Sequence, residues 1–145
     1  MMSDCHVKID KNKTLVMRYV KEVQEQHSLS TIGEIFAEDF VDHSRVAGGM
    51  FDGGLAQLSQ GLASILGAFP DLEVTINHLL AEGDKVVAHK SFRATHLGPW
   101  MGVAATGKRV EWELISIYGI RDDKISDYWG ILDDRRLNES LGLPL

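Results

Sequence analysis

The feature that most constrains the fold is a pair of long alternating segments near the C-terminus, residues 109–120 and 124–132. Apolar and polar side chains alternate along both segments, which is typical of strands that are buried on one face. The residues between them, Arg121-Asp122-Asp123, suit a tight turn, so the two segments are predicted to form an antiparallel hairpin. Any pocket in this protein is expected to have this hairpin as its floor.

The register of the hairpin decides which side chains share a face. A three-residue loop with Asp123 at positive φ would place Ile120 opposite Lys124. In that register one face of the hairpin lines the pocket and carries Trp112, Leu114, Ser116, Tyr118, Tyr128, Gly130 and Leu132. The opposite, outer face carries Glu113, Ile115, Ile117, Asp127, Trp129, Ile131 and Asp133. A four-residue loop would shift the second strand by one residue and regroup its side chains. We expect the three-residue loop.

The rest of the chain divides into a helical part and a strand-rich part. Apolar spacing and capping residues predict helices over residues 11–27 after Asp10, over a short stretch after Ser30, over 55–68 and over 135–141. Period-two alternation predicts strands over residues 72–77 and 86–95, with a turn at 82–84 between them. Residues 40–43 are expected to be extended, and the glycine pairs Gly48-Gly49 and Gly53-Gly54 indicate a connection.

Helices first and long antiparallel strands afterwards indicate a single α+β domain over residues 1–145. We expect a curved antiparallel sheet, covered by the N-terminal helices, to form a cone whose open mouth is a small-molecule pocket. The outer sheet face also carries apolar residues, among them Ile115, Ile117 and Trp129. A homodimer or higher homo-oligomer through that face is therefore expected.

Composition argues against several classes of protein. The net charge of −6 does not suit a protein that binds the phosphate backbone of nucleic acid. No apolar run approaches the ~20 residues that a membrane span needs, and the N-terminus lacks the layout of a signal peptide. The single cysteine, Cys5, excludes an internal disulfide and fits the reducing cytoplasm. No cluster of His, Cys, Asp and Glu has metal-ligand spacing.

Five short motifs occur in a recognisable order: Phe69-Pro70-Asp71-Leu72, residues 81–87, Thr95-His96-Leu97-Gly98, residues 106–110, and residues 123–125 with Tyr128-Trp129. Together they resemble the SnoaL-like polyketide cyclase family of the nuclear-transport-factor-two-like superfamily, over about residues 12 to 143. The resemblance implies a conical α+β fold, homo-oligomers, and no metal or organic cofactor. It also implies intramolecular aldol ring closure of aromatic polyketide esters.

Such a reaction needs a base that removes a proton from a carbon flanked by carbonyl groups. The resemblance places the family's catalytic aspartate at Gly130 and a second pocket histidine near Ser116, so neither residue is matched. If the alignment shifts, Asp127 or Asp133 would take the aspartate's place, although the expected register puts both on the outer face. The candidate bases are therefore two histidines, whose unperturbed pKa lies near neutrality: His89 in mid-strand and His43 where the chain enters the sheet.

The other candidate site residues would bind substrate. His96 belongs to the third motif and precedes a loop containing Trp100 that could act as a lid. Flat apolar walls with hydroxyl groups suit a polycyclic ligand. On the hairpin, such contacts are expected from Trp112, Ser116, Tyr118, Tyr128 and Gly130. For each histidine and aromatic residue, a purely structural role is the alternative.

Three functions remain open from the sequence. The first is a cofactor-independent cyclase, or a related aldol or isomerase enzyme, that acts on a small hydrophobic carbonyl compound. The second is a non-catalytic small-molecule binding protein on the same fold, which Gly130 and Ser116 favour because they replace the acid/base pair. The third, epoxide hydrolysis, needs an Asp–Arg–Asp set around a water; Arg93 is available, but the last-strand aspartate is missing.

Overall fold

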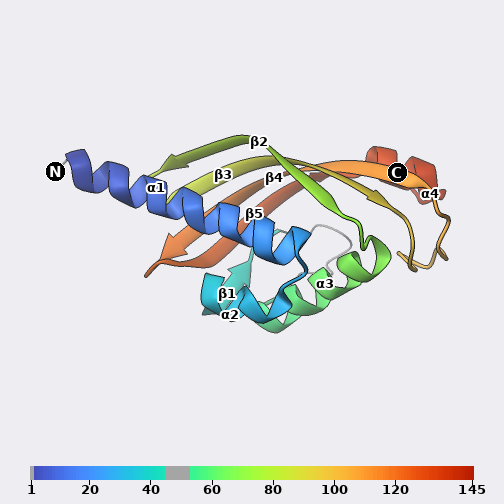
Figure 1. The fold of residues 1–145 in the computed structure, drawn as a ribbon, viewed down its shortest axis with the longest axis horizontal. Helices are drawn as coiled ribbons and strands as arrows, with labels where there is room; N and C mark the ends of the chain where they lie inside the picture. Colours follow the sequence, from blue (N-terminus) through green and yellow to red (C-terminus); the bar gives the residue numbers. More distant parts are fainter. Residues whose placement is uncertain (1, 45–52) are drawn as a thin grey trace.

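The computed structural model describes residues 2–44 and 53–145, so Gly48 and Gly49 lie outside the described residues. Five strands form one curved open sheet in the order β1-β5-β4-β3-β2. Their bounds are β1 Phe36–Asp42, β2 Glu73–Glu82, β3 Lys85–Thr95, β4 Arg109–Arg121 and β5 Lys124–Asp133. Neighbouring strands are antiparallel, except that β1 is parallel to β5. Figure 1 shows α1, α2 and α3 on one side of this sheet and α4 at its far end, which agrees with the predicted α+β cone.

The helical elements are α1 Met2–Arg18, the π-helical segment η1 Tyr19–Glu25, the short η2 Leu29–Thr31, α2 Ile32–Ile35, α3 Leu55–Ala68 and α4 Arg135–Leu141. The bounds predicted for α3 and α4 are confirmed. The first helix begins earlier than predicted, because Asp10 lies inside it instead of capping it. The backbone carbonyl of Asp10 accepts a hydrogen bond from Thr14 Oγ1 at 2.8 Å, a contact typical of a helix interior.

The tip of the β4–β5 hairpin differs from the prediction. The turn has two residues, Asp122 and Asp123, with φ of 52° and 60°, so that Arg121 pairs with Lys124. Positive φ at both central residues is the signature of a type I′ turn, which matches the twist of the strands. The three-residue loop was therefore wrong. A β-bulge between this pair and Tyr128 adds one residue to β5 and restores the predicted faces: Tyr118 pairs with Tyr128.

The core consists of two clusters of buried side chains. One lies beneath α1 and β1 and contains Tyr19, Phe36 and Tyr118. The other joins α3, α4 and the far ends of β3 and β4, and it contains Phe69 and Trp112. Burying one large apolar side chain contributes roughly 1.5–3 kcal/mol, so these clusters supply most of the stability of the fold.

Three of the five sequence motifs, over residues 69–72, 95–98 and 106–110, meet where α3, β3 and β4 join. The carboxylate of Asp71 accepts hydrogen bonds from the backbone N–H and the hydroxyl of Thr95, at 2.7 and 2.6 Å, and it pairs with Arg109 at 3.0 Å. The backbone of Gly98 packs so closely on α3 that a Cβ at this position would lie 2.3 Å from the carbonyl oxygen of Gly67. These motifs therefore fix how the elements join.

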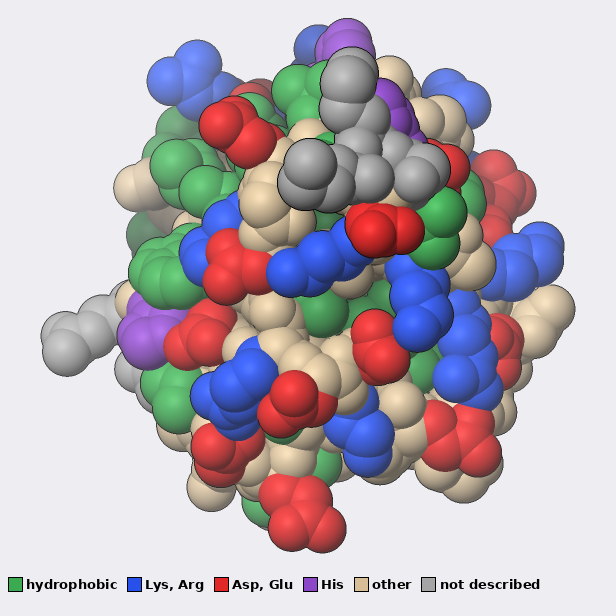
Figure 2. Space-filling view, turned by 90° about the vertical axis from the view of Figure 1, so that its left-hand side faces the viewer, with side chains coloured by type: hydrophobic (Ala, Val, Ile, Leu, Met, Phe, Trp, Pro, Cys, Tyr) green, Lys and Arg blue, Asp and Glu red, His purple; other side chains and the backbone are tan. Residues whose placement is uncertain are grey.

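Charged side chains of both signs are interspersed on the end of the molecule from which α1 starts (Figure 2). Two exposed ion pairs connect the hairpin tip to its neighbours: Lys11 pairs with Asp123 at 3.2 Å, and Arg121 pairs with Asp39 at 2.5 Å. Exposed pairs of this kind contribute about 0–1 kcal/mol each. Among the described helices, none is long and apolar enough to span a membrane.

Candidate functional site

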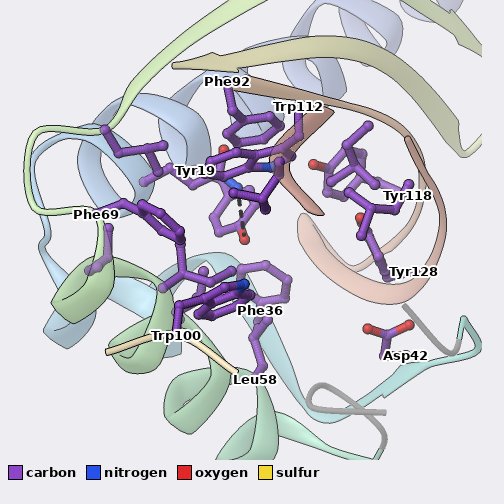
Figure 3. A pocket seen from close by; sticks show the side chains of 18 of the residues that line it. Tyr19, Phe36, Asp42, Leu58, Phe69, Phe92, Trp100, Trp112, Tyr118 and Tyr128 are labelled. Carbon is purple, nitrogen blue, oxygen red and sulfur yellow. Dashed lines mark hydrogen bonds between the residues drawn. The ribbon is translucent and has the colours of Figure 1, made fainter. Parts of the chain in front are cut away.

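A cavity lies between the helices and the concave face of the sheet, and it touches both core clusters (Figure 3). Its volume is about 90 Å³. An apolar cavity of about 150 Å³ holds benzene, so a ligand with more than one ring requires side chains of the wall to move.

Most of the cavity wall is apolar. Six phenylalanine and tryptophan side chains contribute to it: Phe36, Phe40, Phe69, Phe92, Trp100 and Trp112. Leucine and isoleucine side chains from α3, β4, β5 and α4 fill the spaces between them. The rings of Phe92 and Trp112 stack with an angle of 4° between their planes, so they present a flat surface to the cavity.

The polar groups are concentrated on one side of the cavity. In Figure 3, Asp42, Tyr118 and Tyr128 lie on the opposite side from Phe69 and Trp100. Tyr128 Oη is 2.9 Å from Ser116 Oγ, and the rings of Tyr118 and Tyr128 meet edge to face at 5.3 Å. Burial raises the pKa of the Tyr118 hydroxyl, and burial together with the neighbouring Tyr118 raises that of Tyr128. Both hydroxyls are therefore neutral hydrogen-bond donors at physiological pH.

Asp42 contributes a carboxylate to the cavity wall from the end of β1. The residue is only 8% exposed. Its Oδ1 accepts hydrogen bonds from the Ser44 hydroxyl and from the Ser44 backbone N–H, the latter at 2.8 Å. These bonds hold the carboxylate in place, so this side of the cavity combines a general-base candidate with two hydroxyl donors.

The π-helical segment brings two further polar side chains to the cavity. Tyr19 and Gln24 are five residues apart, which would put them about 140° apart around a regular α-helix. In the wider π turn they face the same way: Gln24 Nε2 donates to Tyr19 Oη at 3.4 Å, and both residues line the cavity. Such π turns occur frequently at functional sites.

The expectation that His89 faces the cavity is wrong. Along β3 the even-numbered residues from Val86 to Ala94 are buried, so His89 lies on the outer face. There its Nε2 is 3.1 Å from Glu113 Oε1, and its ring stacks on that of His78. On the same face Arg93 is exposed and pairs with Glu111, so the Asp–Arg–Asp set of an epoxide hydrolase is not assembled around this arginine.

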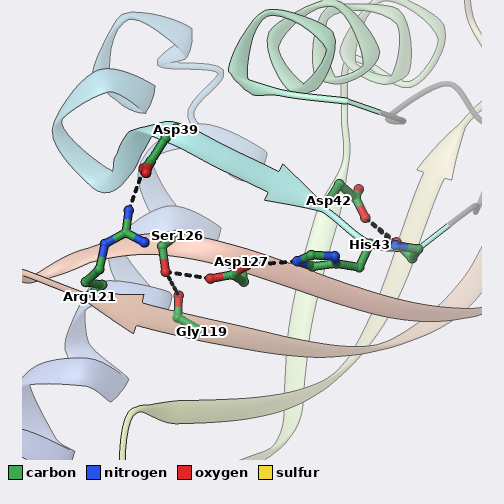
Figure 4. A network of polar contacts seen from close by, with 8 residues as sticks. Asp39, Asp42, His43, Gly119, Arg121, Ser126 and Asp127 are labelled. Atoms are coloured by element: carbon green, nitrogen blue, oxygen red, sulfur yellow. Dashed lines mark hydrogen bonds and ion pairs between the residues drawn. The ribbon is translucent and has the colours of Figure 1, made fainter.

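His43 also lies outside the cavity, which corrects its assignment as a pocket base. Its Nε2 is 2.8 Å from Asp127 Oδ1, and its ring stacks on Trp129 with centroids 4.7 Å apart. Figure 4 shows the imidazole directed at Asp127 and the Asp42 carboxylate pointing elsewhere. Successive residues of an extended chain point in opposite directions, so the outward placement of His43 puts Asp42 inside. That alternation was the signal in the sequence that could have identified Asp42.

His96 is fully buried and does not line the cavity. Its Nδ1 accepts a hydrogen bond from the backbone N–H of Thr106 at 3.2 Å, and its ring packs against Phe69. Within residues 2–44 and 53–145 its Nε2 has no hydrogen-bond partner. His96 therefore fixes the loop behind the wall.

The predicted wall residues Trp100, Trp112, Tyr118 and Tyr128 all line the cavity, while their contact with substrate remains a prediction. Ser116 and Gly130 lie directly opposite one another in the sheet, behind the Tyr128 hydroxyl. Across the described ranges, no three His, Cys, Asp or Glu side chains are grouped as a metal site.

Sequence reasoning missed Lys90 as well as Asp42. Lys90 is 0% exposed, and its Nζ donates a hydrogen bond to Tyr118 Oη at 2.7 Å. Burial lowers the pKa of this amine from 10.5 to about 7. The alternation along β3 did place Lys90 on the inner face, but a lysine so placed is unusual, because lysine is almost never fully buried without a partner.

Comparisons with known proteins agree with this architecture. The sequence profile of the SnoaL-like polyketide cyclase family matches residues 14–141. No curated protein matches the sequence. Among solved structures, AclR from Streptomyces galilaeus, a proposed hydroxylase, is 31% identical with a TM-score of 0.83, and the match covers 94% of this chain and 99% of AclR.

Two further structures share the fold at lower identity. A proposed polyketide cyclase from Acidithiobacillus ferrooxidans is 24% identical with a TM-score of 0.81, and the match covers 91% of this chain and 94% of that protein. IdmH from Streptomyces antibioticus, also a proposed polyketide cyclase, is 24% identical with a TM-score of 0.75, covering 90% of this chain and 99% of IdmH. Because the family profile spans most of the chain, this protein belongs to the SnoaL-like polyketide cyclase family.

Proposed function

We propose that this member of the family catalyses an intramolecular aldol cyclisation, or related enolate chemistry, on a small hydrophobic polyketide-like carbonyl compound, without a metal or organic cofactor. The observation that carries this proposal is the position of Asp42 in the wall of a cavity that is otherwise apolar apart from hydroxyl, amide and indole groups. Asp42 would be the general base that removes a proton from a carbon next to a carbonyl group.

The tyrosine hydroxyls would stabilise the charge that this step creates. Proton removal leaves an enolate oxygen, and hydrogen-bond donors fixed in a water-poor site stabilise such an oxyanion strongly. Tyr118 and Tyr128 lie on the same side of the cavity as Asp42, and both keep their protons. The stacked rings of Phe92 and Trp112 would orient a flat substrate.

A base at Asp42 argues against a purely binding function. That alternative was based on Gly130 and Ser116, which the resemblance places where the family has its acid/base pair. Asp42 would supply a carboxylate from β1 instead.

We also propose that the protein acts as a homodimer in the cytoplasm. The outer sheet face exposes Ile115, Ile117, Trp129 and Ile131 side by side, and Ile131 is 75% exposed. A patch of this kind favours burial against a second copy. The single exposed cysteine, Cys5, suits a reducing compartment.

Exchange of α-protons tests the proposed base. The probe is 2-tetralone, a small bicyclic ketone with exchangeable α-protons, incubated with the full chain in D2O and followed by ¹H NMR. We expect the wild-type protein to accelerate exchange and Asp42→Asn to lose about 10²–10⁴-fold of that acceleration, which is the usual contribution of a general base.

Two aspartates on the outer face provide matched controls. Asp127 contacts His43, and Asp133 lies exposed at the end of β5. Asp127→Asn and Asp133→Asn should exchange protons at the wild-type rate. If either one loses activity while Asp42→Asn keeps it, the base has been assigned to the wrong strand.

A further inference from the structure

Lys90 is a buried amine without a counter-charge. In the described part of the chain no carboxylate forms an ion pair with it, and burial alone accounts for its lowered pKa. Taking a charge out of water costs several kcal/mol unless an opposite charge compensates it. A bound ligand can therefore be the source of the negative charge that would compensate Lys90.

The surroundings of Lys90 belong to the cavity wall. Its Nζ lies 5.7, 5.5 and 5.5 Å from the ring centroids of Tyr19, Phe92 and Tyr118, and all three residues line the cavity. The electron-rich faces of aromatic rings attract a cation, so the rings of Tyr19 and Phe92 support a protonated amine without neutralising it. The amine is therefore one layer behind the cavity surface.

Tyr118 links Lys90 to the cavity. Tyr118 Oη accepts the hydrogen bond from Lys90 Nζ, so its own proton is available to an acceptor in the cavity. A hydroxyl that accepts from an ammonium group is a stronger donor, because hydrogen bonds in a chain polarise one another. The positive charge of Lys90 thus reaches the cavity through one hydroxyl group.

We propose that the cavity binds a flat apolar ligand through an ionised enol or phenol oxygen, and that Lys90 provides the counter-charge through Tyr118. The proton balance is simple: the ligand loses its O–H proton, the amine of Lys90 gains one, and no covalent bond forms. Lys90 acts through Tyr118 and is therefore a positioning residue. This inference rests on the proposed function, because the enolate that Asp42 would generate is the same kind of anion.

The test uses 2-naphthol, whose neutral and ionised forms differ in their ultraviolet absorption. The full chain is titrated with 2-naphthol at a fixed pH at which the free compound is neutral. We expect the wild-type protein to bind it in the ionised form. Lys90→Met should bind it in the neutral form and at least about tenfold more weakly, and Tyr118→Phe should also lose most of the ionised fraction.

Controls separate charge from folding. Lys85→Met removes an exposed lysine from the same strand and should behave as wild type. Folding of each variant is checked by near-ultraviolet circular dichroism, and Tyr118→Phe keeps the aromatic ring if Lys90→Met fails to fold. The proposal is overturned if 2-naphthol does not bind, if it binds to wild type as the neutral form, or if Lys90→Met binds the ionised form as wild type does.

Asp42→Asn distinguishes this inference from the proposed function. It should keep, or increase, the ionised fraction of 2-naphthol, because it removes a negative charge from the cavity wall without touching Lys90. If Asp42→Asn still exchanges the protons of 2-tetralone but binds ionised 2-naphthol, the proposed base fails and the counter-charge stands. If Asp42→Asn loses exchange while Lys90→Met binds 2-naphthol as wild type does, the proposed base stands and the counter-charge fails.

Discussion

Gly130 lies directly against the phenol of Tyr128. A Cβ built on Gly130 would be 2.7 Å from Tyr128 Oη and 3.0 Å from Cε1. The absence of a side chain allows the Tyr128 ring to lie back over its own strand, where its hydroxyl reaches Ser116 on β4. Gly130 therefore has a packing role in this chain.

Gly130→Ala should displace the Tyr128 ring and destabilise the protein by about 1–3 kcal/mol, the usual cost of inserting a methyl group into a packed site. Urea unfolding measures the loss. Gly67→Ala is the control, because an added Cβ meets nothing within 4 Å there. Gly67 lies in α3, so Gly67→Ala should raise the free energy of unfolding by about 0.5–1 kcal/mol, because alanine has a higher helix propensity than glycine. If Gly130→Ala is as stable as wild type, the close approach to Tyr128 is not a constraint.

Lys90→Met should stabilise the protein at neutral pH. Burial lowers the pKa of Lys90 from 10.5 to about 7, and each pKa unit corresponds to about 1.4 kcal/mol, so on the order of 5 kcal/mol is at stake. Between pH 7 and 10.5 the unfolded state binds more protons than the folded state, so wild-type stability rises with pH through this range. The stability of Lys90→Met should not rise with pH in this way, because methionine does not titrate.

The measurement is the free energy of unfolding in urea at pH 7 and at pH 10. The gap between Lys90→Met and wild type should be largest at pH 7 and should shrink toward pH 10. Lys85→Met should run parallel to wild type. If the unfolding free energy of Lys90→Met also changes with pH in parallel with that of wild type, the pKa of Lys90 does not differ between the folded and unfolded states.

His43→Gln should leave the proton exchange of 2-tetralone unchanged and weaken the protein in acid. The hydrogen bond from His43 is the main cause of the lowered pKa of Asp127. A carboxylate whose folded pKa is lowered stabilises the fold above its unfolded pKa, and this contribution is lost as pH falls through the folded pKa. Acid unfolding should therefore begin at a higher pH in the variant. A loss of exchange activity instead would restore His43 as a member of the site.

The double variant Ile117→Glu/Ile131→Glu should convert a homodimer into a monomer. Both residues lie on the outer sheet face, and two charges there would prevent that face from packing against a second copy. Analytical ultracentrifugation gives the molecular mass in solution. Val7→Glu, an exposed apolar residue of α1, is the control and should remain dimeric. A monomeric wild-type protein at all concentrations would rule out the proposed dimer.

Much of the fold could be predicted from the sequence, because the strand faces depend only on alternation. The assignment of Trp112, Tyr118 and Tyr128 to one face is confirmed, although the turn that was expected to produce it is wrong. A two-residue turn and a bulge together shift the register by an even number, which leaves the faces unchanged. The individual pairs depend on backbone geometry at Asp122 and Asp123, which short-range patterns do not determine.

The site was harder to predict than the fold. Two of the motifs that carry the resemblance act where elements join: Asp71 binds Thr95, and Gly98 packs on α3. The choice of histidines as bases relied on their pKa near neutrality and passed over Asp42 and Lys90. Both of these residues depend on burial for their properties, and burial is set by contacts between distant parts of the chain.

The π-helical segment lets the first helix carry one extra residue without losing its two polar contacts with the cavity. An α-helix turns by about 100° per residue, so removing one residue between Tyr19 and Gln24 would leave them four residues apart and about 40° apart around a regular helix. Both side chains would then still face the cavity. A one-residue change of length at this point therefore offers a single-step route by which relatives of this chain could change the first helix and keep both polar groups in the cavity wall.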